Sequence, residues 1–145
     1  MTATIAHNAH RTAAAAAIST KARNAGRIVS GLVVAFLLFD ALSKLAGVQA
    51  VRDASAELGI PSGQTSVIGA VLLACTALYV WKRTAVLGAV FLTGYLGGAV
   101  TINMINEKPL VSTTLFAVYF GVVVWLGLWL RDARVRNLVD DILGR

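Results

Sequence analysis

Asp40 and Lys44 are the two residues of this chain whose types and spacing point most directly to chemistry. Both lie in a long apolar segment, residues 28–47, that is otherwise typical of a membrane-spanning helix. An ionisable side chain near the middle of a bilayer costs ~2.5–3.5 kcal/mol on insertion scales, so it usually faces a bundle interior or a wet cavity. The i, i+4 spacing places carboxylate and ammonium on one helix face. Two interpretations stay open: a functional pocket, or a structural ion pair with Lys44 reaching outward.

Other polar side chains in the apolar segments are expected at similar depths. Counting ~1.5 Å per residue along each helix places them in the same half of the membrane as Asp40. A polar pocket in the outer half of a helix bundle is one interpretation, and hydrogen bonds to neighbouring backbone are the other. The candidate pocket residues are Asp40, Lys44, Gln64, Tyr95, Thr101, Asn103 and Tyr119.

The sequence gives little support for a metal site or for a catalytic nucleophile. The two histidines, His7 and His10, precede every apolar segment, which argues against a bound haem and against a histidine-built metal site. Cys75 is the one cysteine and lies in an apolar run, so we expect a small packing residue. The chain has no nucleotide-binding, metalloprotease or hydrolase motif. We assign no catalytic residue and expect that the chain is not an enzyme by itself.

The elements that hold these residues are predicted to be membrane spans. Hydrophobic residues make up 57% of the chain and charged residues 14%, against ~25% charged in an average soluble domain. Four apolar segments approach or exceed the ~20 residues that a spanning helix needs. Short connections between neighbours predict an all-α, up-down four-helix bundle of one domain, residues 28–130. The predicted spans are residues 28–47, 63–81, 84–105 and 110–130.

The basic residues predict the orientation of the bundle. Ten of the 13 Lys and Arg residues fall in the N-terminal tail, the second loop and the C-terminal tail. By the positive-inside rule both termini are cytoplasmic, in a multi-pass protein of the plasma membrane. Tyr79, Trp81 and Trp129 are then expected at the cytoplasmic interface. The chain has no basic groove motif with stacking aromatic residues, so nothing in it indicates nucleic-acid binding.

Three segments outside the spans have predictions of their own. Residues 1–27 are expected to form a polar, disordered tail. Residues 48–62 are predicted to contain a short amphipathic helix ended by Gly59 and Pro61, which either lies on the membrane surface or covers the mouth of a cavity. Residues 131–145 are predicted to form a cytoplasmic amphipathic helix.

The third span carries a glycine pattern, with Gly94 and Gly98 in GxxxG spacing, Gly97 beside them and Gly88 on a nearby face. Small residues let helix backbones approach closely, so we expect these glycines to pack against a neighbouring helix. Association with a second copy and access for a flat ligand are the alternatives.

The order and spacing of three segments resemble the DoxX-like family of small four-helix membrane proteins. They are LLFDALSKLAG in the first span, RTAVLGAVFLTGYLGGAV in the third, and VVWLGLWLRDARVR at the end of the fourth. The resemblance points to Asp40, Lys44 and residues 95–98. It departs at Asn103, where related sequences often carry a His that could relay a proton.

The resemblance implies an accessory subunit of a membrane redox system, with a quinone as the candidate ligand and a partner protein that supplies electrons. The alternative is a scaffold or assembly factor without enzymatic activity, which binds lipids or metabolites and acts as a homo-oligomer or with other membrane proteins. In both cases the lipid bilayer is the surrounding medium.

Overall fold

The computed structural model describes residues 18–144, and every regular element in that range is a helix. Four helices are long and apolar enough to cross a membrane, which confirms the predicted all-α fold with four spans. They are α2 (Thr20–Leu45), α4 (Ser62–Val80), α5 (Ala85–Ile105) and α6 (Leu115–Arg131), the last preceded by the π-helical turn η1 (Leu110–Thr114). Two shorter helices accompany them, α3 (Gln49–Glu57) and α7 (Ala133–Ile142).

Helix α2 begins well before the predicted start of its span at Ile28. Its first residue is Thr20, and the Ser19 hydroxyl caps it by accepting a 3.2 Å hydrogen bond from the Ala22 amide. The residues between are helical, so the expectation of disorder is wrong over this stretch. The hydropathy pattern did not reveal this first part of α2, because its residues are polar. Helix propensity and a serine cap do not depend on hydropathy, so they allow the helix to begin earlier. The rest of the predicted tail, residues 1–17, lies outside the described residues.

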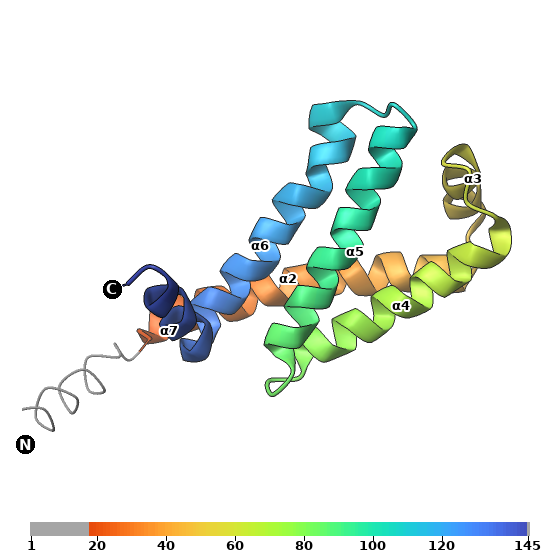
Figure 1. The fold of residues 1–145 in the computed structure, drawn as a ribbon. Coiled ribbons are helices and arrows are strands. Elements are labelled where there is room, and N and C mark those ends of the chain that lie inside the picture. The colour runs from red at the N-terminus through yellow and green to blue at the C-terminus, as the bar shows by residue number, and fades with distance from the viewer. Residues whose placement is uncertain (1–17, 145) are drawn as a thin grey trace, which may run out of the picture.

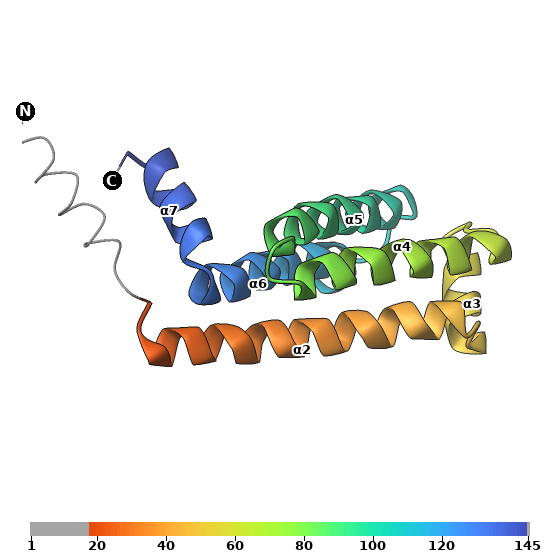
Figure 2. The same cartoon turned by 90° about the horizontal axis from the view of Figure 1, so that it is seen from below.

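The four long helices form a ring in which each contacts two others. Helix α2 packs against α4 and α6, and α5 packs against the same two helices from the other side. Sequential neighbours run antiparallel (Figures 1 and 2). Toward the end where α3 lies, the α5–α6 pair leans away from the α2–α4 pair (Figure 1). The bundle is therefore closed at the α7 end and spread at the α3 end.

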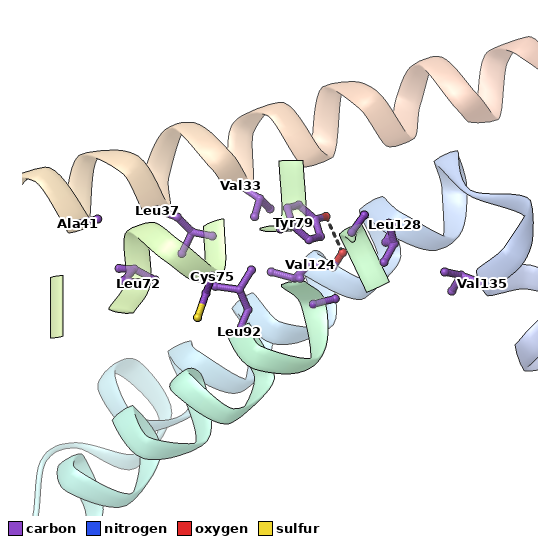
Figure 3. Close-up of a cluster of buried hydrophobic side chains, with 12 residues drawn as sticks. Val33, Leu37, Ala41, Leu72, Cys75, Tyr79, Leu92, Val124, Leu128 and Val135 are labelled. Atoms are coloured by element: carbon purple, nitrogen blue, oxygen red, sulfur yellow. Dashed lines mark hydrogen bonds between the residues drawn. The ribbon is translucent and has the colours of Figure 1, made fainter. Parts of the chain in front are cut away.

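Tyr79 of α4 lies at the centre of the closed end. Its side chain is fully buried, and its hydroxyl donates a 2.9 Å hydrogen bond to the Val124 carbonyl of α6 (Figure 3). Ser30 of α2 lies 3.2 Å from the same hydroxyl, and Arg131 places its guanidinium 4.8 Å from the ring centre. Tyr79 lies in the last turn of α4, where its predicted place at the membrane interface stays a prediction, but its phenol finds its partners inside the bundle.

Apolar side chains from all four long helices surround Tyr79. Cys75 is among them and is buried, which confirms its expected role as a packing residue. The cluster also contains Val33, Leu37, Ala41, Leu72, Ala85, Ala89, Leu92, Val124 and Leu128, with Val135 of α7 at its edge (Figure 3).

The glycines named for packing in α5 differ in their surroundings. A Cβ atom added to Gly94, Gly97 or Gly98 would meet nothing within 4 Å, so these three make no close contact with another helix of the described residues. Close approach occurs instead at Gly88 of α5, which lies directly against the Tyr79 backbone. Spacing alone could not distinguish these positions, because a GxxxG pair does not state which face of a helix meets a neighbour.

A pair of substitutions tests this assignment. We expect Gly88→Ala to lower the free energy of unfolding by roughly 1–3 kcal/mol, because the added methyl group overlaps the Tyr79 backbone. Gly94→Ala is the matched control and should be neutral or stabilising by roughly 0.5–1 kcal/mol, since alanine favours a helix and has open space there. Denaturant unfolding in detergent micelles, followed by circular dichroism, measures both. Equal losses in the two variants would contradict the assignment.

Candidate ligand-binding site

A cavity of about 800 Å³ occupies the spread end of the bundle. It lies between the α2–α4 and α5–α6 pairs, and residues of α3 form part of its wall. Its volume is in the range of ~300–1,000 Å³ that is usual for small-molecule sites. We call it the ligand cavity. Its polar or charged lining residues are Asp40, Lys44, Ser55, Gln64, Thr65, Tyr95, Asn103 and Thr113.

Asp40 and Lys44 form the predicted ion pair, and both face the ligand cavity. The Lys44 ammonium donates a hydrogen bond to Asp40 Oδ1. The side chains are 17% exposed for Lys44 and 34% for Asp40, so neither is sealed in the core. Gly69 of α4 makes room for the pair, since a Cβ atom there would lie 2.8 Å from Lys44 Cβ. The ion pair is thus held against α4 on one side and open to the cavity on the other.

The other predicted pocket residues separate into two groups. Gln64, Tyr95 and Asn103 line the ligand cavity with the ion pair. Thr101 and Tyr119 do not: both are exposed on the outside of the bundle, and the Thr101 hydroxyl donates to the Gly97 carbonyl of its own helix. Depth along the helix axis was the basis for including them, but the rotation of each helix decides which side chains point inward.

Three phenylalanines that the sequence analysis treated only as apolar form an aromatic cluster in the cavity wall. The rings of Phe36 and Phe120 have centroids 5.0 Å apart, and Phe116 lies 6.0 Å from each. These separations are within the ~4.5–7 Å range of favourable aromatic pairs. In the sequence, the one signal for this cluster is the i, i+4 spacing of Phe116 and Phe120. It indicates that the two rings share a helix face but does not indicate which side chains that face contacts.

Thr65 contributes a polar atom that the protein leaves unsatisfied. Thr65 is 2% exposed, and its hydroxyl has no hydrogen-bond partner within residues 18–144. A buried hydroxyl without a partner costs ~1–3 kcal/mol, so such groups in native proteins usually meet a water, an ion or a ligand. Thr65 is among the residues that line the ligand cavity, although its hydroxyl itself is covered by protein atoms. Gly94 and Gly98 also line the cavity.

Helix α3 covers this end of the bundle. It follows the turn at Gly47 and ends before Gly59, whose φ of +71° suits glycine, so the predicted short helix is confirmed. The Asn106 amide donates a 3.3 Å hydrogen bond to the Leu58 carbonyl, and Lys108 lies 3.2 Å from the Glu57 carboxylate. Helix α3 is therefore attached across the cavity to the end of α5. This arrangement supports the interpretation of α3 as a cover for a cavity mouth.

The residues of the cavity suit an amphiphile better than a metal ion. Within residues 18–144 no three His, Cys, Asp or Glu side chains gather closely enough to hold a metal. The cavity instead combines hydrogen-bonding groups from α2 and α4 with an aromatic surface from α2 and α6. A flat molecule with a polar head could meet both at once.

A double-mutant cycle measures how strongly the ion pair contributes to stability. Asp40→Asn and Lys44→Met should each destabilise the protein, because each leaves one charge in the bundle without its counterion. The double variant should regain stability, with an interaction energy of roughly 0.5–3 kcal/mol between the two sites. Denaturant unfolding in micelles gives all four values. Purely additive losses would contradict an interaction between the two side chains.

The comparisons with known proteins agree with the fold. A search among curated proteins and a search among solved structures returned no match. The family model of the DoxX-like family matches residues 28–127, which include α4 and α5 entirely, α2 from Ile28 onward and α6 up to Gly127. The chain belongs to the DoxX-like family.

Proposed function

We propose that this membrane protein binds a quinone-like amphiphile in the ligand cavity and serves as an accessory subunit of a membrane redox system. The observation that carries the proposal is the Asp40–Lys44 pair, which is partly exposed and faces the ligand cavity. Ionisable side chains inside a membrane usually face a wet cavity or a ligand path, so a ligand with hydrogen-bonding groups is a natural partner for this pair.

The chemistry of a quinone matches the three parts of the cavity. A quinone carbonyl oxygen accepts hydrogen bonds, and the Lys44 ammonium, which faces the cavity, is a donor. The hydroxyl of the reduced form donates, and the Asp40 carboxylate accepts. The flat ring would lie against the cluster of Phe36, Phe116 and Phe120, since aromatic faces stack favourably. An apolar tail could leave between the helices into lipid.

The chain itself would bind and orient the ligand, and a partner protein would supply or remove electrons. Asp40 would accept a hydrogen bond from the hydroxyl of the reduced ligand, and Lys44 would hold that carboxylate in place through the ion pair. Asn103 lines the cavity and can hydrogen-bond a carbonyl, although it cannot relay a proton as a histidine would.

We further propose that the α7 end faces the cytoplasm and the ligand cavity lies toward the opposite side of the plasma membrane. Lys82 and Arg83 lie between α4 and α5, and the Lys82 carbonyl accepts a 2.5 Å hydrogen bond from Arg134 of α7. The basic residues of this loop and of α7 therefore share one end of the bundle. The positive-inside rule assigns that end to the cytoplasm.

Mass spectrometry of organic extracts tests the proposal on protein purified in mild detergent. We expect a stoichiometric quinone in the wild type and its loss in Asp40→Asn. Thr65→Val should stabilise the ligand-free protein, because it removes an unsatisfied buried hydroxyl.

Thr101→Val is the control for retention. It replaces a polar side chain outside the cavity, so it should leave quinone retention unchanged. Extracts of the wild type that contain only bulk phospholipid would overturn the quinone proposal and favour a scaffold or assembly factor. A loss of quinone that is equal in Asp40→Asn and Thr101→Val would contradict the assigned site.

A further inference from the structure

A second hollow lies on the other side of α5, where α5, α6 and α7 meet. This groove has a volume of about 590 Å³, and we call it the α5–α6 groove. Apart from two tryptophans, Thr93 is the one residue in the lining of the groove with a polar side chain. The Thr93 hydroxyl already donates to the Ala89 carbonyl and accepts from the Trp125 indole. The groove thus leaves its occupant little hydrogen bonding, and the part of a molecule that lies in it must be apolar.

The middle of the groove is hollow because two glycines, Gly97 and Gly121, lie in its wall. A Cβ atom at Gly97 would find no neighbour within 4 Å, and the Cβ of a residue at Gly121 would meet only the end of the Leu96 side chain, at 3.5 Å. These small positions leave a depression between two helices whose other lining residues are mostly large. An extended hydrocarbon chain fits such a depression along its length.

The end of the groove at α7 carries a positive charge. Arg136 of α7 holds its guanidinium 4.4 Å from the centre of the Trp129 ring, and Trp129 lines the groove. Arg136 Nε donates a 3.0 Å hydrogen bond to the Trp129 carbonyl, which fixes the position of the guanidinium. Stacking on an aromatic face leaves the terminal amino groups at the guanidinium edge, where they can form a fork with a phosphate.

Arg136 differs from the neighbouring Arg134 in having no carboxylate partner. Arg134 lies 2.8 Å from the Asp132 carboxylate, and this hydrogen bond holds the pKa of Asp132 below its usual value, so that charge is balanced. The ion pairs found within residues 18–144 join Lys44 to Asp40, Lys108 to Glu57 and Arg134 to Asp132, and none involves Arg136. An uncompensated arginine therefore stands at the end of an apolar groove.

We infer that the α5–α6 groove is a binding site for an anionic phospholipid. One acyl chain lies between α5 and α6 across Gly97, and the headgroup phosphate is held by Arg136 beside Trp129. A tryptophan at the level of the headgroups and an arginine within reach of a phosphate are the features that such a lipid requires. The site is separate from the ligand cavity and does not depend on the function proposed for it.

Native mass spectrometry of the full chain in detergent tests the site, with phosphatidylglycerol and phosphatidylcholine as probes. We expect one tightly bound phosphatidylglycerol. Arg136→Ala should weaken its affinity about tenfold, as the loss of a charge-assisted hydrogen bond would, and should weaken phosphatidylcholine less, because the choline cation already balances the phosphate of that lipid. Gly97→Leu should weaken both lipids, because its side chain fills the groove without displacing a neighbour.

Arg23→Ala is the matched control, since Arg23 is an exposed arginine of α2. It should not change phosphatidylglycerol binding. Equal losses in Arg23→Ala and Arg136→Ala would overturn the proposal in favour of diffuse charge attraction. A Gly97→Leu variant that separates a dimer into monomers while lipid binding persists would show that a second copy covers the groove. Should Arg136→Ala fail to fold, Gly97→Leu decides alone.

Discussion

The hydroxyl of Tyr79 is the contact on which the arrangement of the four long helices depends. A phenol in the middle of a membrane protein must find its partners within the bundle, because hydrocarbon offers none. Tyr79 finds them in the Val124 carbonyl of α6 and the Ser30 hydroxyl of α2, while its backbone lies against Gly88 of α5. One residue of α4 thus contacts the other three long helices. The buried core and the closed α7 end are built around this point of contact.

The ligand cavity exists because nothing of comparable strength joins the helices at the α3 end. There the α5–α6 pair is attached through α3, by the Asn106–Leu58 hydrogen bond and the Lys108–Glu57 ion pair. The Glu57 side chain is 70% exposed, and an exposed pair of this kind is worth ~0–1 kcal/mol. The polar residues that hydropathy marks as costly in a span therefore line a space, and among them Asp40 and Lys44 also pair with each other. The proposed ligand site thus lies at the weakly joined end of the bundle.

Sequence reasoning predicted what depends on distance along the chain. Hydropathy gave the four spans, and i, i+4 spacing gave the Asp40–Lys44 pair. It failed where the answer depends on how a helix is rotated in the bundle. Thr101 and Tyr119 were assigned to the pocket although both are exposed. Neither the unsatisfied Thr65 hydroxyl nor the phenylalanine cluster could be foreseen, because both arise from contacts between separate helices.

The glycines of α5 acquire a physical reason once both hollows are considered together. Gly94 and Gly98 border the ligand cavity, while Gly97 borders the α5–α6 groove. The glycines that resemble a packing motif instead leave room beside two faces of α5, so that this helix separates the two hollows. Leu96 and Ala117 line both. An occupant of one space that shifts these side chains changes the shape of the other, and any such coupling must act equally in both directions.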